Sequence, residues 1–316
     1  LTRRFVKLLW PLLVKLAEEA SPRIRTQADP EARKALLTME HEEAMARVMY
    51  AVRERKGSAL LTGEYGCGKT LLSRVIWSEL QQEKKYQAVF ILDPRLSRAQ
   101  LLQEILFQLN NGDVPKTKIQ LFHALNKILF SNHNDGKHTV IVIDEAQSIR
   151  TKETFEELRL LLNFQLTNAF LLTIVLLGSS ELKGAIAKLP QFVQRLAVRY
   201  HIHGLTEAET FEYIKHRMGI AGCEKEIFQK DALKDIYLAS GGVPRRINTI
   251  CDLALLVAYG SGLNTIGRDI ILKIGEDMEF SGHNVQPHNL QPAARKANRL
   301  PADVAVQLAD SPKVQV

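Results

Sequence analysis

The sequence predicts an α/β fold in which a parallel sheet is covered on both faces, followed by an all-helical region. Short apolar runs alternate with helical patterns as far as Gly204, and the run at residues 140–143 is apolar at every position. Parallel strands buried on both faces show such continuous runs, whereas half-exposed strands alternate. Beyond Gly204 only helical patterns occur. We therefore expect an α/β body at residues 41–204 and a smaller helical domain at residues 205–277.

Each predicted element follows from local periodicity and from capping or turn residues. Buried strands are expected at residues 59–61, 88–92, 140–143, 170–177 and 198–202. Helices of the body are expected at residues 40–55, 71–82, 97–109, 117–130 and 153–165. Thr206, with Glu209 three residues later, forms a capping-box pattern that begins a helix ending near Met218. Further helices are expected at residues 230–239, 244–259 and 266–275.

The two ends of the chain lie outside these domains. Residues 1–40 contain an apolar segment at 5–16 that is too short to span a bilayer, followed by a linker. We expect this segment to be a helix that docks on the body or on a partner, with a helix on a membrane surface as the alternative. Residues 278–316 are polar with weak periodicity, which predicts a tail that is disordered or that a partner orders.

Composition is typical of a globular protein of a reducing compartment. The chain has 316 residues, of which 46% are hydrophobic and 24% are charged. Its three cysteines show no metal-ligand spacing, which favours a cytoplasmic protein, with peripheral attachment to the inner membrane as an alternative. The net charge of +7 permits contact with nucleic acid or an anionic membrane but requires neither. No apolar run is long enough to predict a membrane span.

Residues 58–70 carry the pattern that indicates a ligand class. A short apolar strand ends at Gly63, and the spacing Gly63-x-x-x-x-Gly68-Lys69-Thr70 leads directly into a helical pattern. Glycines allow the loop amides to point inward, and the positive end of the helix adds to the attraction for phosphate. The Lys69 ammonium is placed for the β- and γ-phosphates, and the Thr70 hydroxyl for Mg²⁺. We expect the nucleotide, ATP, to contact Gly63, Glu64, Tyr65, Gly66, Cys67, Gly68, Lys69, Thr70 and Leu71.

Two acidic residues and a serine follow other strands of the predicted sheet. Asp144 and Glu145 come directly after the strand at 140–143, at the edge where open α/β sheets bind ligands. Asp144 is placed to hold Mg²⁺, directly or through water, and Glu145 is placed to polarise a water for attack on the γ-phosphate. Ser179 follows the strand at 170–177, where its hydroxyl either orients that water or is only a polar turn residue.

Two pairs of arginines are candidates for contact with the nucleotide. Arg195 or Arg199, near the last strand, could be presented to the γ-phosphate of a neighbouring subunit and neutralise developing charge there. Arg245 and Arg246 follow Pro244, which suits the first turn of a helix, and one of the two would point inward to the nucleotide. Ordinary surface arginines are the alternative in both places.

Cys67 carries a weaker signal. Its place at a helix N-terminus predicts a lowered thiol pKa and a reactivity that bound ATP suppresses, whereas a small neutral filler is the simpler account. The alternation of His201 and His203 indicates strand geometry and not a metal site.

Several of these stretches together resemble a known family. Residues 63–70, 143–147, 157–163, 174–178 and 242–248 are similar, in order and spacing, to AAA+ ATPases of the general secretion pathway protein A type. The resemblance covers residues 41–275 and implies a P-loop NTPase with a parallel αβα sandwich body and a C-terminal all-helical AAA+ lid. It implies that Ser179 lies near the first sensor, that Arg195 is an arginine finger and that Arg245 is the second sensor. Cys67 and Ser179 depart from the residues usual in this family.

The expected function is that of a Mg²⁺-dependent ATPase. The resemblance implies ATP-dependent assembly into a ring or filament with active sites at subunit interfaces, together with a partner protein of a secretion or pilus-assembly machine. Transposon target-selection ATPases look similar over the same span, so a regulator of transposition that forms filaments on duplex DNA is the alternative. A third interpretation, a module that holds ATP without turnover, is disfavoured by the intact Asp144-Glu145 pair.

Overall fold

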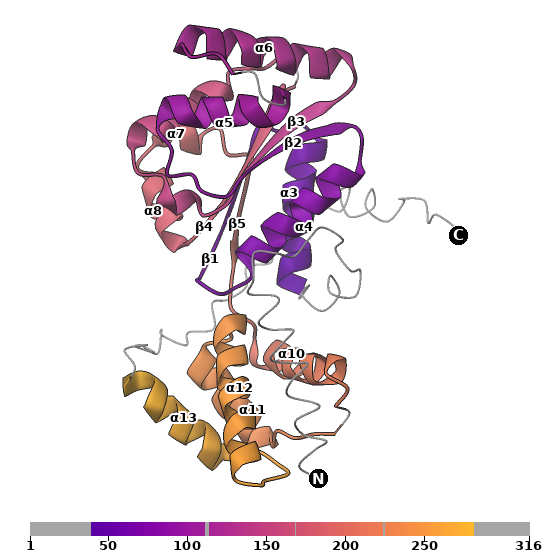
Figure 1. The fold of residues 1–316 in the computed structure, drawn as a ribbon, viewed down its shortest axis with the longest axis vertical. Coiled ribbons are helices and arrows are strands. Elements are labelled where there is room, and N and C mark those ends of the chain that lie inside the picture. The colour runs from indigo at the N-terminus through magenta and orange to yellow at the C-terminus, as the bar shows by residue number, and fades with distance from the viewer. Residues whose placement is uncertain (1–38, 111–113, 168, 224, 281–316) are drawn as a thin grey trace, which may run out of the picture. The chain divides into compact units, whose positions relative to one another are not determined.

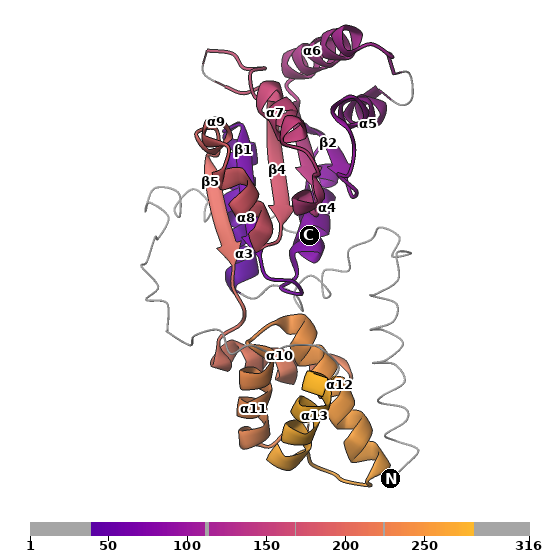
Figure 2. The same ribbon diagram turned by 90° about the vertical axis from the view of Figure 1, so that its left-hand side faces the viewer.

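The computed structural model describes residues 39–110, 114–167, 169–223 and 225–280. These residues form a five-stranded parallel sheet with helices on both faces, and helices alone follow the last strand (Figures 1 and 2). The strands are β1 Ser58–Gly63, β2 Tyr86–Ile91, β3 His138–Ile143, β4 Leu172–Gly178 and β5 Val198–Ile202. Their order across the sheet is β2-β3-β4-β1-β5, and every neighbouring pair is parallel. The predicted fold class is confirmed.

The register of the central strands brings three strand ends to one edge of the sheet. Thr62 of β1 lies opposite Gly178 of β4, and Ile143 of β3 lies opposite Leu176 of β4. The residues that follow these strands therefore start from neighbouring positions. This edge is formed by the carboxyl ends of the strands, where parallel α/β sheets bind ligands.

Helices cover the sheet from both sides because the strand residues alternate between its faces. Val140 and Val142 of β3 pack with α3 Met39–Arg53 and α4 Lys69–Gln82 in one buried cluster. Ile141 and Ile143 belong to the cluster on the other side of the sheet. The helices on that side are α5 Arg98–Asn110, α6 Lys118–Asn134, α7 Lys152–Leu161, α8 Ser180–Ala187 and α9 Pro190–Val193. A strand buried on both faces needs apolar residues on both of them, as residues 140–143 of β3 supply.

The helical region has a hydrophobic cluster of its own. The helices of this region are α10 Glu207–Ile220, α11 Lys230–Ser240, α12 Pro244–Gly260 and α13 Arg268–Phe280. The capping box predicted for α10 is present: Thr206 accepts a hydrogen bond from the Glu209 amide, and the Glu209 carboxylate accepts one from the Thr206 amide at 2.8 Å. The assignment of residues 41–204 and 205–277 as two domains stays a prediction.

Some element bounds differ from the prediction. The helix predicted at 153–165 ends at Leu161, and Gln165, beyond its end, pairs with Phe170 in an antiparallel bridge. Helix α13 continues to Phe280, so the first residues of the predicted tail are helical. The predictions for residues 1–38 and for 281–316 lie outside the described residues. Within the described part, no helix has the length and apolar character needed to cross a membrane.

Candidate functional site

The predicted phosphate loop lies between β1 and α4 and requires glycine at two positions. Gly66 and Gly68 have φ values of 87° and 85°, in the left-handed region that residues with a Cβ rarely adopt. A Cβ at Gly68 would lie 2.7 Å from His41 Nε2, and one at Gly66 would lie 2.7 Å from the Cβ of Arg245. Both turns of the loop are therefore packed against other elements, α3 on one side and the start of α12 on the other.

Lys69 is the first residue of α4, and its side chain folds back over the loop. The ammonium donates hydrogen bonds to the carbonyls of Gly63, at 2.9 Å, and Glu64, at 2.8 Å. The residue is 5% exposed, and burial lowers its pKa. Loop carbonyls are weak partners for a buried ammonium, so a phosphate group would stabilise its charged form more strongly.

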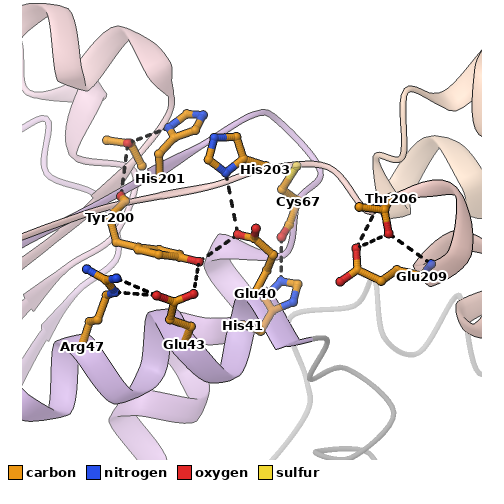
Figure 3. A network of polar contacts seen from close by, with 11 residues as sticks. Glu40, His41, Glu43, Arg47, Cys67, Tyr200, His201, His203, Thr206 and Glu209 are labelled. Atoms are coloured by element: carbon orange, nitrogen blue, oxygen red, sulfur yellow. Dashed lines mark hydrogen bonds and ion pairs between the residues drawn. The ribbon is translucent and has the colours of Figure 1, made fainter. Parts of the chain in front are cut away.

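His41 of α3 supports the same loop, and the sequence analysis missed it. Its Nε2 lies 2.8 Å from the carbonyl oxygen of Cys67, which can only accept, so this nitrogen carries the proton (Figure 3). Burial lowers the pKa of His41 and favours the neutral ring. A histidine on an amphipathic helix carries no signal of this contact, because its partner lies 26 residues away.

Helix α3 is itself attached to the edge strand β5. The Tyr200 hydroxyl lies 3.0 Å from a carboxylate oxygen of Glu40 and 3.1 Å from one of Glu43 (Figure 3). Glu43 also accepts hydrogen bonds from the Arg47 guanidinium. Burial, together with these carboxylates, raises the pKa of Tyr200, so the hydroxyl stays protonated and can donate. These contacts hold the first turn of α3, and with it His41, beside the phosphate loop.

The structure overturns the prediction of a reactive Cys67. The side chain is 1% exposed and belongs to the cluster beneath α3 and α4. Burial raises the thiol pKa to about 11, and this outweighs the opposing effect of the Lys69 charge. Cys67 is therefore a small neutral filler, the alternative that the sequence analysis also gave.

Asp144 follows β3 and lies against the first turns of α4. One carboxylate oxygen accepts from the Ser73 hydroxyl and the other from the Glu145 amide, both at 2.9 Å. The residue is 2% exposed, and burial raises its pKa, while hydrogen bonds from Ser73, Glu145 and Thr70 oppose that shift. A buried carboxylate beside the Thr70 hydroxyl fits a hard cation, because Mg²⁺ prefers oxygen ligands. Among the described residues no group of three or more His, Cys, Asp or Glu could hold a metal by itself, so phosphate oxygens and water would complete the shell.

Glu145 has an unusual backbone conformation. Its φ and ψ are 49° and 36°, in the left-handed region, which costs a residue other than glycine about 1–3 kcal/mol. The short helix η1, Ala146–Ser148, begins directly afterwards. The side chain of Gln147 in this helix donates to Glu145 Oε2 at 2.5 Å. The sequence pattern predicts no role for Gln147 or for Ser73.

Ser179 lies between β4 and α8, in the position expected from the sequence. Its amide donates to Gln147 Oε1 at 3.0 Å. The residue is 2% exposed, and its hydroxyl has no hydrogen-bond partner within the described part of the chain. A buried hydroxyl without a partner is costly, which favours a site that a phosphate oxygen or a water completes. The neighbouring Ser180 donates to the Glu64 carboxylate of the phosphate loop at 2.7 Å.

Arg195 lies away from the loop of its own chain. Its carbonyl accepts from the hydroxyl of Ser58, the first residue of β1, whereas the loop follows the last residue of that strand. The guanidinium contacts Gln165 and Asn163 at 3.4 and 3.3 Å. Arg199 is exposed and donates to the Val193 carbonyl. The structure therefore brings neither arginine to the phosphate loop within this chain.

Arg245 is close to the loop through its backbone. Its amide donates to the Gly66 carbonyl at 3.3 Å, and its Cβ packs on Gly66. Val243, just before α12, belongs to the same buried cluster as Cys67 and Leu72. The start of α12 is therefore joined to the phosphate loop, and the exposed Arg245 side chain extends from that junction.

The fold and the arrangement of this edge define an AAA+ P-loop protein. Residues 52–186 match the family described as AAA domain. Over 241 residues the chain is 36% identical to the general secretion pathway protein A of Aeromonas hydrophila, a match that covers 75% of this chain and 43% of that protein. The chain thus contains an AAA domain and is similar to general secretion pathway protein A, as the resemblance implied.

More distant relatives support the fold. An uncharacterised HTH-type transcriptional regulator of Methanocaldococcus jannaschii is 23% identical over 279 residues, with 83% of this chain and 66% of that protein covered. The Drosophila ORC, in a structure bound to DNA, matches with a TM-score of 0.59 at 19% identity, over 83% of this chain and 72% of that one. The Thermotoga maritima RuvB Holliday junction branch migration motor matches with a TM-score of 0.51 at 21% identity, over 76% and 69%. The chain spans less than two thirds of either curated relative.

Proposed function

We propose that this chain hydrolyses ATP with Mg²⁺, assembles with further copies of itself and serves a secretion or pilus-assembly machine. One observation carries the proposal. Asp144 and Glu145 directly follow β3, and Ser179 directly follows β4. Lys69 begins α4 after the loop that follows β1, and the strand register brings these three strand ends to one edge of the sheet. Phosphoryl transfer needs this set of groups: a cation for the phosphates, a ligand for the metal, a base for water and a polar group near the γ-phosphate.

Each residue has a separate task in this proposal. Lys69 exchanges its loop carbonyls for phosphate oxygens, and the loop amides and the start of α4 bind the remaining phosphate charge. Thr70 and Asp144 hold Mg²⁺, which when bound neutralises charge on the phosphates. The Glu145 carboxylate orients the attacking water and accepts its proton. The Ser179 hydroxyl donates to that water or to the γ-phosphate.

The proposed oligomer follows from the place of Arg195. β1 has six residues, so its two ends lie roughly 17 Å apart at about 3.3 Å per residue. The Arg195 carbonyl is bonded to Ser58 at the amino end of β1, and its guanidinium contacts Gln165 and Asn163. The phosphate loop follows the carboxyl end of β1, so in this proposal Arg195 is out of reach of the nucleotide bound by its own chain. In an oligomer, Arg195 of one copy could reach the nucleotide bound by a second copy, where it would act as an arginine finger in trans.

The biological role rests on the secretion relative. Similarity to general secretion pathway protein A favours a secretion role over the regulator of transposition that the sequence left open. The two are separable by binding to duplex DNA with ATP present, at two salt concentrations. A DNA-binding regulator should bind and lose affinity steeply as salt rises, because counterions are released from the phosphates. Tight, salt-sensitive, ATP-dependent binding would contradict the secretion assignment.

The test of the ATPase proposal is Glu145→Gln. This change removes the base and keeps both the size of the side chain and the Mg²⁺ ligand Asp144. We expect ATP affinity close to that of the wild type, and turnover reduced about 10²-fold or more, because general-base catalysis contributes that much. Equilibrium binding of a fluorescent ATP analogue and release of phosphate provide the two measurements. Turnover close to the wild-type rate would exclude Glu145 as the base.

A further inference from the structure

The side chain of Gln147 joins two parts of the site that are distant in sequence. Its Nε2 donates to Glu145 Oε2 at 2.5 Å, and its Oε1 accepts the Ser179 amide proton at 3.0 Å. One contact lies at the end of β3 and the other at the end of β4. A side-chain amide is suited to this place, because it offers a donor and an acceptor in one fixed plane.

The two hydrogen bonds of Gln147, to Glu145 and to the Ser179 amide, form a bridge that supports the Glu145 carboxylate. One oxygen of Glu145 is held by Gln147, while Oε1 accepts no hydrogen bond from the described residues. The backbone restricts Glu145 as well: its amide is bonded to Asp144 Oδ1, and its φ is 49°. A carboxylate with one oxygen fixed and the other open is arranged to receive a proton from a single direction.

Gly178, which lies against the Gln147 side chain in the fold, leaves space for the bridge. A Cβ at Gly178, the last residue of β4, would lie 2.6 Å from Gln147 Oε1. Any other residue at position 178 would therefore have to displace the amide. Glycine here permits the amide to reach the Ser179 backbone, so the end of β4 and the orientation of Glu145 are linked.

We propose that Gln147 is a positioning residue, which fixes the Glu145 carboxylate relative to the Ser179 position and so sets the rate of hydrolysis without binding the nucleotide. This inference rests on the proposed function, in which Glu145 acts as the base. It adds a residue for which the sequence analysis assigned no role. It also gives a physical link through which a change at the end of β4 would alter the base at the end of β3.

Two substitutions separate positioning from simple structural support. Gln147→Leu removes both hydrogen bonds at similar size. Gln147→Glu keeps an acceptor for the Ser179 amide but places a carboxylate where Glu145 needs a donor. Gln108→Leu is the matched control: the Gln108 amide also donates to a glutamate, Glu104, and accepts a backbone proton, that of Phe90, but lies on α5 away from the site.

We expect both Gln147 variants to lower kcat about 10- to 100-fold, the worth of a hydrogen bond to a charged group, while the Kd for ATP changes less than about threefold. Gln108→Leu should keep wild-type kcat even if its thermal unfolding temperature falls. The measurements are steady-state phosphate release at pH 8, ATP-analogue binding and thermal unfolding of each full-length variant. If Gln147→Leu does not fold, Gln147→Glu alone carries the test.

The outcomes distinguish this inference from the proposed function. If the wild type turns over, Glu145→Gln does not, and Gln147→Glu keeps the wild-type kcat, then Gln147 only supports the start of α8 and the inference is wrong. A raised kcat in Gln147→Leu would also overturn it, because the bridge would then restrain the base. If the wild type releases no phosphate, the proposed function itself fails, and if wild type and Glu145→Gln turn over equally, Glu145 is not the base that this inference requires.

Discussion

At the scale of single residues, burial opposes charge on both sides of the candidate site. Burial lowers the pKa of Lys69 and raises that of Asp144, so each charged form is disfavoured. Phosphates beside Lys69 and a divalent cation beside Asp144 would reverse both effects. The buried surroundings of Lys69 and Asp144 would therefore favour the binding of a phosphate together with its metal ion.

The three cysteines give a residue-scale prediction. Cys67 and Cys251 are buried, and Cys223 is partly exposed. Burial raises the pKa of both buried thiols, so little thiolate forms in either. We expect a thiol reagent at pH 8 to modify native protein at Cys223 alone, with or without ATP, as peptide mass spectrometry would show. Rapid labelling of Cys67 that ATP suppresses would contradict the burial described here, and labelling in denaturant is the control.

The sequence predicts those residues of the candidate site that lie at a fixed spacing within a motif or directly after a strand. Lys69 and Thr70 follow from the glycine pattern, and Asp144 and Glu145 follow from their place after a buried strand. The contacts of Gln147 with Ser179 and of His41 with Cys67 could not be predicted, because the two residues of each pair lie 32 and 26 residues apart in the sequence. Only the fold brings such pairs together, and a polar residue in a turn or on a helix has many ordinary explanations.

At the scale of elements, strand prediction succeeded because β1, β3 and β4 are buried along their whole length. The short helices around residues 180–193 were harder to assign. Helix α9 has only four residues, too few for a helical periodicity to show. Continuous apolar runs are a strong signal, whereas a single helical turn depends on the tertiary contacts that stabilise it.

Strand β3 begins with a buried histidine, which gives a prediction on pH. His138 is 3% exposed, and burial lowers its pKa to about 3 from 6.5. Its folded pKa lies below its unfolded pKa, so the unfolded chain takes up the proton first, and stability falls as the pH drops below 6.5. The contribution of His138 approaches about 1.4 kcal/mol per pH unit between these two values.

The measurement is denaturant unfolding between pH 7 and pH 5. We expect the free energy of unfolding to decrease with falling pH in the wild type, and to decrease less in His138→Gln, which cannot take up the proton. The glutamine can still bond to Thr173, the present partner of His138 Nε2. Equal slopes for the two proteins would show that His138 does not contribute to the pH dependence.

At the scale of the whole molecule, Arg195 predicts cooperation between copies. Arg195→Ala should bind ATP but hydrolyse it about 10³-fold more slowly or worse, as expected for a missing arginine finger. Lys69→Ala should lose ATP binding, because the phosphate charge is then poorly neutralised, but it keeps its arginine. We expect a mixture of the two variants to recover part of the activity, measured as phosphate release.

Recovery in the mixture has a direct control. Arg199→Ala, altered at the other candidate, should stay active alone if Arg195 is the finger. If the two first variants co-assemble in light scattering and the mixture stays inactive, the trans role of Arg195 is wrong. If Arg199→Ala is inactive alone, and a mixture of Arg199→Ala with Lys69→Ala recovers activity where the mixture with Arg195→Ala does not, then Arg199 is the arginine finger.

The position of β1 in the sheet has a consequence for the synthesis of the chain. Of the strands in the described part of the chain, β1 is synthesised first, yet its neighbours β4 and β5 lie more than 100 residues further along the chain. During synthesis, β1 therefore does not have both of its sheet partners until residue 202 has been made. Such long-range pairing slows folding and exposes the nascent strand to wrong contacts. Truncations that end between β3 and β4 should therefore aggregate, whereas chains that include β5 can bury β1 on both sides.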